Sequence, residues 1–530
     1  MVRILIAGEL RPVWRLGKPH HLHGVSGGAH NIIALLVHTV VLSKLGCPKR
    51  NAPPASREPR FLPLRTAQIP LFSAVNKGRT ATTDSVPCSP TKKDRSIACS
   101  RPKSKAAIQM IGRRTISRWI TSPKVTRLLA GPFLYGWGNS EGSDILVQNA
   151  RSILVVRLDS IGDLVLTSPL LRELRRLNPD AWITLVVDPR YVNLVELCPF
   201  VSEVLTFELE THGGPFGRLA LHMCALRLAG RHLWRRQFDL ALLPRWDVDY
   251  YHSAFVAYFS GALSRVGYSE KVTPSRQQND RGLDILFTHM LDDRAVKHEV
   301  ERNLHLLRQL GGTVTNNHLE LWLGDEDREA AQTALSSRGV TRADLLVALA
   351  PGAGHGKRLW PANRFIDVGR FLQQEWGARV LITGGPDDRE RALQVQESLG
   401  TGAVSLAGEM TLRQSAALLE HVKLVVTNDS GPMHLAAAAG ATVVEISCHP
   451  ASGDSLHRNS PVRFRPWTKD YAVLQPPQAA EPCTTGCEWH EAHCILGVSV
   501  EAVREAARTL LNTRSYFRPS AAQLSPSASI

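Results

Sequence analysis

Two carboxylates interrupt an otherwise apolar stretch, VVRLDSIGDLVLTSPLL, at residues 155–171. Asp159 and Asp163 lie between an apolar run that ends at Arg157 and a second run that follows Gly162 and Asp163. A carboxylate in the first turn of a helix often only complements the partial positive charge of the helix N-terminus. A carboxylate at the mouth of a cleft can instead accept a proton as a general base. From these residues alone both interpretations stay open for Asp163, and Asp159 is the weaker candidate.

A second stretch, PGAGHGKRLWPANRF at residues 351–365, combines glycines with cations. Glycines let a backbone approach a ligand closely, and the proline favours the start of a helix after them. Cations beside the free N–H groups of a helix N-terminus form phosphate sites, although the Gly-Lys-Ser/Thr of a P-loop does not follow. The stretch is either a phosphate-binding loop or an ordinary glycine loop with solvated basic residues. The candidate binding residues are Gly352, Gly354, Lys357 and Arg358.

A third stretch, TNDSGPMHLAAAAG at residues 427–440, follows an apolar run and reads as a strand-to-helix turn. Asp429 can accept hydrogen bonds from ribose or sugar hydroxyls. Ser430 and Gly431 precede helical residues whose free N–H groups suit a diphosphate. His434 lies one turn further along and is either a ligand contact or a satisfied packing residue.

A cluster of soft metal ligands occurs in CTTGCEWHEAHC near the C-terminus. Cysteine and histidine this close together can bind Zn²⁺, but three residues separate the first two cysteines, which is an imperfect spacing. The sequence favours a loop of reduced thiols and leaves the zinc site as the alternative. The residues concerned are Cys483, Cys487, His490, His493 and Cys494.

These residues need a scaffold, and the chain from about residue 151 alternates between strand-like and helix-like patterns. Such alternation predicts βαβ units and parallel sheets. We expect two Rossmann-like domains, at residues 151–322 and 323–513, whose strand ends face a common cleft. The predicted strands lie at residues 152–158, 182–187, 201–207, 238–244, 344–352, 379–385, 423–431 and 442–447.

The remaining segments look unlike folded domains. Residues 1–150 hold 23 of the 63 Lys and Arg but only 6 of the 48 Asp and Glu, so the net charge of +15 originates there. We expect a basic, largely irregular extension, with short amphipathic helices in residues 107–135 that Pro123 separates, and a disordered tail at residues 514–530. The extension is a solvated segment, a surface attracted to anionic lipid, or an over-extended start of translation. The near-neutral remainder argues against a nucleic-acid partner.

Nine scattered cysteines imply no disulfide framework, so a reducing cytosol is the expected compartment. The most apolar early stretch, residues 32–46, is shorter than the roughly 20 residues that span a bilayer. We therefore expect a soluble or peripheral protein without a secretory signal.

Four motifs, in order, resemble those of glycosyltransferase family 9, the ADP-heptose:lipopolysaccharide heptosyltransferase family. They are ILVVRLDSIGDLVLTSPLL, HEVERNLHLLRQLG, PGAGHGKRLWPANRF and TNDSGPMHLAAAAG. The resemblance covers residues 151–513 and implies a GT-B fold, in which two Rossmann-like domains bind the acceptor and the nucleotide-sugar respectively. It also implies inversion of the anomeric configuration without a metal or another cofactor.

The resemblance further assigns roles to residues of this sequence. Asp163 matches the proposed base and Asp429 the acid that contacts the donor, with Ser430, Gly431 and His434 beside it. Arg358 matches the basic residue that contacts phosphate, but the more usual lysine is displaced by one position, to Lys357. One of these two cations is expected to reach the diphosphate.

The resemblance predicts transfer of a heptose or related sugar from a nucleotide-diphosphate sugar, with ADP-heptose as the expected donor, to a lipopolysaccharide-core-type, lipid-linked glycan acceptor. The expected place is the cytoplasmic face of the membrane, with peripheral contact to anionic lipid and no nucleic-acid partner. The alternatives are a nucleotide-sugar epimerase or hydrolase on similar domains, and a degenerate protein that only binds.

Overall fold

The computed structural model describes residues 3–6, 9–12, 117–135, 146–208 and 217–513. The chain divides into two compact units, Met1–Ala98 and Cys99–Ile530. In the first unit, β1 (Arg3–Ile6) and β2 (Glu9–Pro12) form an antiparallel hairpin. Most of the predicted basic extension, the apolar stretch at residues 32–46 and the C-terminal tail lie outside the described residues. All candidate site residues belong to the second unit.

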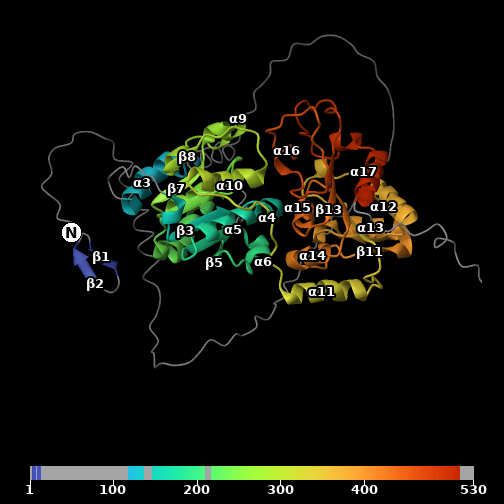
Figure 1. Ribbon diagram of the computed structural model, residues 1–530. Helices are drawn as coiled ribbons and strands as arrows, with labels where there is room; N and C mark the ends of the chain where they lie inside the picture. The colour runs from blue at the N-terminus through green and yellow to red at the C-terminus, as the bar shows by residue number, and fades with distance from the viewer. Residues whose placement is uncertain (1–2, 7–8, 13–116, 136–145, 209–216, 514–530) are drawn as a thin grey trace, which may run out of the picture. The chain divides into compact units, whose positions relative to one another are not determined.

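The second unit contains two parallel six-stranded sheets with the same topology (Figure 1). The first sheet has the order β5-β4-β3-β6-β7-β8 and the second the order β11-β10-β9-β12-β13-β14. In each sheet, the first strand along the chain lies in the middle, and the next two strands follow on one side of it. The chain then crosses over, and the last three strands follow on the other side, which is the doubly wound order of Rossmann folds. The predicted α/β class with two Rossmann-like sheets is confirmed, while the exact domain boundaries stay predictions.

The strands of the first sheet are β3 (Ser152–Arg157), β4 (Trp182–Val187), β5 (Glu203–Thr206), β6 (Leu240–Leu243), β7 (Ser264–Tyr268) and β8 (His289–Leu291). Its helices are α3 (Pro123–Tyr135), α4 (Ile161–Val165), α5 (Ser168–Leu177), α6 (Val192–Val195), α7 (Gly217–Leu228), α8 (Ser253–Phe259), α9 (Pro274–Asn279) and α10 (Glu299–Gln309).

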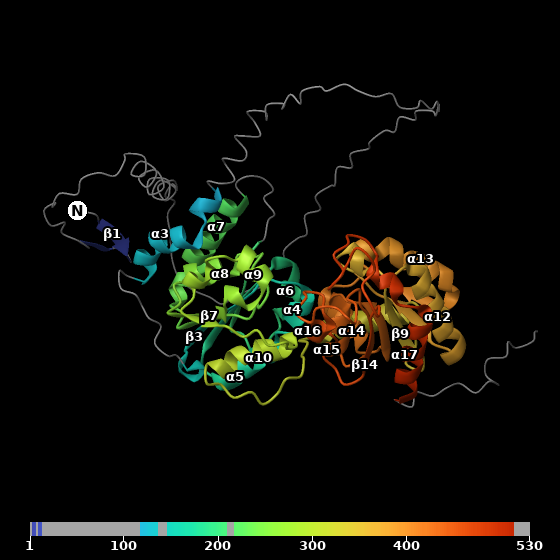
Figure 2. The same cartoon turned by 90° about the horizontal axis from the view of Figure 1, so that it is seen from above.

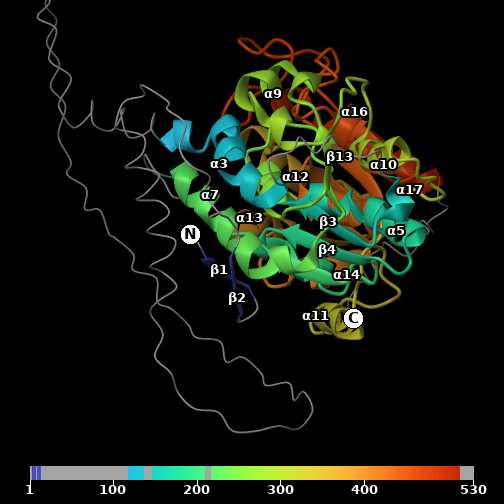
Figure 3. The ribbon, with the colours of Figure 1, turned by 90° about the vertical axis from the view of Figure 1, so that its left-hand side faces the viewer.

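Alternate residues of β3 face two different cores, because successive side chains of a strand point to opposite faces. Ile153 and Val155 belong to the core that includes α5 and α10. Leu154 and Val156 belong to the core that includes α7 and α8, against which α3 also packs. Figure 3 shows α3 and α7 on one side of β3 and β4, and α5 and α10 on the other. A strand covered on both faces explains why this segment is continuously apolar.

The second sheet consists of β9 (Leu346–Ala350), β10 (Arg379–Ile382), β11 (Ala403–Ser405), β12 (Leu424–Asn428), β13 (Thr442–Ile446) and β14 (Tyr471–Leu474). Its helices are α11 (Asp325–Ser336), α12 (Ala362–Trp376), α13 (Arg389–Leu399), α14 (Leu412–Leu419), α15 (Gly431–Ala438), α16 (Pro461–Phe464) and α17 (Val500–Thr513).

The two sheet domains meet through short helices at the carboxyl ends of their strands (Figure 2). Helix α4 of the first domain packs against α15 of the second. From α16, the buried Arg463 bonds to Glu299 at the start of α10, with distances of 3.0 and 2.9 Å to Oε1. Arg463 also bonds to Asp247 at 3.2 Å. A third contact joins Arg413 of α14 to the backbone of Asn193 in α6.

Candidate active site

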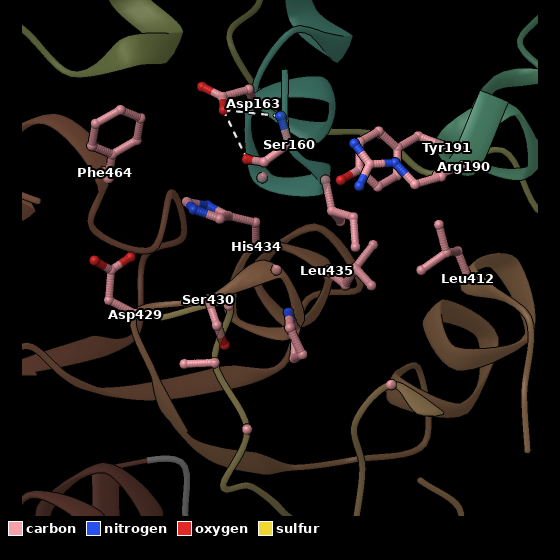
Figure 4. A pocket seen from close by; sticks show the side chains of 18 of the residues that line it. Ser160, Asp163, Arg190, Tyr191, Leu412, Asp429, Ser430, His434, Leu435 and Phe464 are labelled. Carbon is pink, nitrogen blue, oxygen red and sulfur yellow. Dashed lines mark hydrogen bonds between the residues drawn. The ribbon is translucent and has the colours of Figure 1, made fainter. Parts of the chain in front are cut away.

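The sequence motifs come together at the reversal point of each sheet. The reversal point is the position in the middle of the sheet where the order of the strands along the chain changes direction. Neighbouring strands β3 and β6 form that point in the first sheet, and β9 and β12 form it in the second. Crevices outside these strand ends are where doubly wound folds bind ligands. A cleft of about 820 Å³ lies there between the two domains and is lined by residues of both. Figure 4 shows Asp163 on one wall and Asp429 on the other.

Asp163 lies in the first turn of α4 and faces this cleft. Its Oδ2 accepts hydrogen bonds from Ser160, at 2.8 Å from the hydroxyl and 3.3 Å from the backbone N–H. Its Oδ1 accepts a bond from Arg157 at 3.0 Å, and its side chain remains 18% exposed. The two interpretations of Asp163 are therefore compatible, since it caps a helix and presents a carboxylate to the cleft.

Burial alone would raise the pKa of Asp163, but the nearby cations Arg157 and Arg245 and the Ser160 hydrogen bond outweigh it and lower that pKa below the usual value. The carboxylate is consequently ionised at neutral pH, which a proton acceptor requires.

Asp159 occupies a different position, buried beneath the cleft. It pairs with Arg157 at 3.1 Å and with Arg245, and it does not line the cleft. Its carboxylate holds the two guanidinium groups that surround Asp163. Asp159 is therefore a positioning residue in this structure.

The helices α4 and α15 touch at two glycines. A Cβ on Gly162 would lie 2.4 Å from Cδ2 of His434, and a Cβ on Gly431 would lie 3.2 Å from Ile161. The first distance is too short for any side chain, so the glycine next to Asp163 is required by the approach of His434 from the other domain. This contact brings the two halves of the site together.

His434 lies between Asp163 and Asp429 (Figure 4). It is buried, and burial lowers the pKa of its imidazole in spite of the two carboxylates, so the ring is neutral at physiological pH. Its Nδ1 has no hydrogen-bond partner among the described side chains and backbone groups. Buried polar atoms without a partner are rare, so this ring nitrogen is an exception within the site.

Arg358 and Lys357 point in different directions from a short 3₁₀ turn, Gly356–Arg358. Arg358 lines the cleft, where its guanidinium lies 3.4 Å from the Asp429 carboxylate and bonds to Asn459 at 2.7 Å. Lys357 is buried, and its Nζ donates to the backbone carbonyl of Cys487 at 2.6 Å. Of the two predicted cations, Arg358 is the one placed to meet a diphosphate in the cleft.

The predicted glycine loop is held by its own domain. Asn428 at the end of β12 donates to the carbonyls of Pro351 and Gly352 at 3.0 and 3.2 Å and accepts from the backbone of Trp360. A Cβ on Gly352 would lie 2.2 Å from the Asp388 carboxylate, whereas Gly354 borders open space. Gly352 is thus needed for packing against Asp388, and Gly354 is free to face a ligand.

Ser430 and Gly431 line the cleft at the N-terminus of α15. The hydroxyl of Ser430 donates to the carbonyl of Asn428 at 3.2 Å and does not cap the helix. Pro432 has no N–H, and the N–H of Met433 donates to the Ser430 carbonyl at 3.1 Å, so the N–H of Gly431 is the donor of this helix start that remains for a ligand.

Several residues of this region were not predicted from the sequence. Arg157 and Arg245 surround the two aspartates, Asn428 and Asn459 fix the loop and Arg358, and Arg463 joins the domains. For two of these residues, the position relative to a buried strand could have indicated a place at the site. Arg157 ends a buried strand, and Arg245 follows β6, which neighbours β3 at the reversal point. Asn459 and Arg463 lie in an irregular segment, where the sequence offers no periodicity to interpret.

Among the described residues, the single grouping suited to a metal lies outside the cleft. It consists of Cys483, Cys487, His493 and Cys494. Metal independence of the reaction, which the resemblance to glycosyltransferase family 9 implies, stays a prediction.

Comparisons with known proteins agree with this arrangement. Residues 226–491 match the model of glycosyltransferase family 9 (heptosyltransferase). Lipopolysaccharide heptosyltransferase 2 of Escherichia coli K12 is 27% identical over 301 residues, which cover 56% of this chain and 82% of that protein. Lipopolysaccharide heptosyltransferase 3 of the same strain is 25% identical, over 58% of this chain and 83% of that protein.

A solved structure is similar over nearly its whole length. The glycosyl transferase family 9 of Veillonella parvula DSM 2008 superposes with a TM-score of 0.56 and 25% identity, covering 68% of this chain and 98% of that one. The family match includes Arg358 and Asp429 but begins after Asp163. The placement of Asp163 therefore rests on the geometry of the cleft.

Proposed function

The chain belongs to glycosyltransferase family 9, and from this premise we propose that it transfers a heptose or related sugar from ADP-heptose to a lipopolysaccharide-core acceptor. The names of its relatives support this choice of sugar and acceptor. The reaction we propose inverts the anomeric centre in one displacement and requires no metal.

The observation that carries the proposal is the ionised carboxylate of Asp163 at the cleft wall, held by Arg157 and Ser160. In the proposed step, the acceptor hydroxyl oxygen bonds to the anomeric carbon while the bond from that carbon to the diphosphate breaks. Asp163 takes the hydroxyl proton, and the nucleoside diphosphate leaves with the electron pair. Such a transition state has oxocarbenium character, as in related glycosyl chemistry.

The opposite wall supplies groups that suit the leaving diphosphate. Arg358 presents its guanidinium there, and Gly431 presents its backbone N–H at the N-terminus of α15. Fixed donors of this kind stabilise developing negative charge as a metal would. Asp429, which also lines the cleft, is placed to accept hydrogen bonds from sugar or ribose hydroxyls.

Replacement of Asp163 tests the proposal. We expect Asp163→Ala to lower kcat by at least about 100-fold, because general-base catalysis typically contributes that much or more, while calorimetry detects nearly unchanged ADP-heptose binding. Asp325→Ala is a matched control, since Asp325 is exposed on α11. Near-normal turnover by the Asp163 variant would refute the base assignment. Donor consumption without acceptor would instead indicate the hydrolase or epimerase alternative.

The proposed acceptor is lipid-linked, so we also propose that the enzyme works on the inner membrane surface. Helix α3 supports this proposal. Its inner side packs on the first domain, where Tyr135 donates to the carbonyl of Tyr258. Its outer side exposes Leu128 and Phe133 by 73% and 85%. No helix among the described residues is long and apolar enough to cross a bilayer.

A further inference from the structure

The cysteine-rich segment near the C-terminus brings four potential metal ligands to one point. The sulfur atoms of Cys483, Cys487 and Cys494 and a ring nitrogen of His493 all lie within 4.8 Å of one another. Nδ1 of His493 is 3.7 Å from Sγ of Cys483 and 3.5 Å from Sγ of Cys494. A tetrahedral zinc ion with Zn–S of about 2.3 Å and Zn–N of about 2.0 Å keeps such nitrogen and sulfur atoms about 3.5 Å apart. The two nitrogen–sulfur distances therefore match edges of a tetrahedral site, and the other ligand pairs lie within 4.8 Å.

The segment that carries these ligands has little regular secondary structure. Between the end of β14 at Leu474 and the start of α17 at Val500, the regular structure is limited to one 3₁₀ turn, Cys494–Gly497. Long connections without secondary structure are uncommon in compact domains. Cys487 and Cys494 are nonetheless fully buried in the core of the second domain. A metal ion bound at their side chains would supply the missing cross-link.

The composition of the cluster distinguishes a metal site from a disulfide. A disulfide would use two of the three thiols and would leave His493 without a role. Here the imidazole nitrogen lies close to two sulfurs at once. His490, the other histidine of the segment, is exposed and is not part of the group. Although the spacing of the cysteines in the sequence is unusual for a zinc site, the fold of the loop brings their sulfur atoms together.

We propose that Cys483, Cys487, His493 and Cys494 bind one Zn²⁺ ion at a closed structural site. Three thiolates and a neutral imidazole suit zinc, and four protein ligands leave no position open for a substrate. Binding releases the three thiol protons, so the site carries a net charge of −1. The ammonium group of Lys357, buried and bonded to the Cys487 carbonyl, provides a cation next to this charge.

The site also fixes the back of the loop that presents Arg358 to the cleft. Besides the Lys357 bond, the backbone of Gly356 touches that of His490 so closely that a Cβ would lie 2.5 Å from its carbonyl oxygen. Trp360 donates to the Val498 carbonyl at 3.0 Å. The zinc ion thus acts through Lys357 as a positioning element for Arg358. This consequence rests on the proposed function, whereas zinc binding itself does not.

Metal analysis of the full chain, purified without metal-affinity resin under reducing conditions, tests the site. We expect about one zinc per chain, and cobalt substitution should give thiolate-to-metal charge-transfer absorption. His493→Ala and Cys487→Ser should lose the metal. His490→Ala and Cys224→Ser should keep it, because one residue lies three positions from His493 outside the group and the other is exposed on α7.

Three results would overturn the proposal: no stoichiometric metal in the unsubstituted protein, a disulfide among these cysteines by mass spectrometry, or iron in place of zinc. If the variants do not fold, the cobalt spectrum of the unsubstituted protein still decides. Removal of zinc by a chelator should weaken ADP-heptose binding. Stoichiometric zinc in a protein without transferase activity would refute the proposed function and leave the zinc site intact.

Discussion

Asp163 and Asp159 share the guanidinium of Arg157, yet their surroundings give them different tasks. The side chain of Asp163 is 18% exposed, at the cleft, while that of Asp159 is 2% exposed, between two arginines. An ionised group that must accept a proton has to reach the substrate. A group that only orients its neighbours is better placed out of contact with substrate.

The contact between Gly162 and His434 offers a test at this scale. A Cβ at position 162 would meet the buried imidazole at 2.4 Å, so we expect Gly162→Ala to destabilise the protein by about 1–3 kcal/mol and to reduce transfer. Thermal and denaturant unfolding measure the stability. Gly354→Ala is the stability control, because its Cβ would border open space.

A double variant separates this contact from a general effect of alanine. With His434→Ala in the background, the clash disappears, and Gly162→Ala should then cost less than it does alone. Additive effects of the two substitutions would show that the two helices do not meet as described.

The directions of Lys357 and Arg358 could not be derived from their order in the sequence. Both follow the same glycines, and the sequence predicts only that one of them meets phosphate. The structure separates them because the Cys487 carbonyl, 130 positions away, accepts a hydrogen bond from Lys357. The roles of these two cations therefore depend on a partner far away in the sequence, and the local sequence pattern does not reveal that partner.

Among the elements, α3 has two faces with opposite environments. Thr126 and Gly131 are buried toward the first domain, whereas Leu128 and Phe133 are exposed. Exposed cations accompany the apolar side chains, at Lys124 and Arg127 in the helix and at Arg118 before it. An amphipathic helix of this kind is suited to the surface of an anionic membrane.

Substitution of the outer face of α3 should weaken membrane binding. We expect Leu128→Gln with Phe133→Gln to weaken binding to phosphatidylglycerol vesicles, measured by co-sedimentation, by at least about 100-fold, because burial of each apolar side chain contributes roughly 1.5–3 kcal/mol. Leu393→Gln is the control, an exposed leucine on α13. Binding to uncharged phosphatidylcholine vesicles should be weak throughout. Unchanged sedimentation of the double variant would exclude this face as the contact.

Interior strands are predicted from sequence more often than edge strands, although the edge strand β5 is predicted and the interior strand β7 is missed. The predicted segments contain β3, β4, β5 and β6 of the first sheet and β9, β10, β12 and β13 of the second. The missed strands are β7, β8, β11 and β14. Three of these, β8, β11 and β14, form sheet edges, and β8 and β11 have three residues each. Short edge strands are not covered on both sides and lack the long apolar run that marks a buried strand.

In the molecule as a whole, the site exists because two equivalent sheets present their reversal points to each other. The sequence contains the motifs of both domains and predicts a cleft, since strand ends of doubly wound sheets bind ligands. It does not predict the groups that hold the walls together. Glu299 lies in the motif HEVERNLHLLRQLG and has no apparent partner in sequence, because Arg463 is 164 positions away.

The pair of Arg463 and Glu299 is nearly inaccessible to solvent, with side chains 1% and 3% exposed. Arg463→Met would leave Glu299 and Asp247 without their shared cation, which for a buried pair costs about 3–5 kcal/mol. We expect a corresponding drop in the free energy of unfolding in urea, together with loss of transfer as the walls separate. Arg308→Met serves as the comparison on the same helix α10, because the pair of Arg308 with Glu301 is 42% and 32% exposed and should contribute at most about 1 kcal/mol. Equal effects of the two substitutions would mean that the buried pair does not join the domains, and that the cleft is held by the contacts of α4 with α15 and of Arg413 with Asn193.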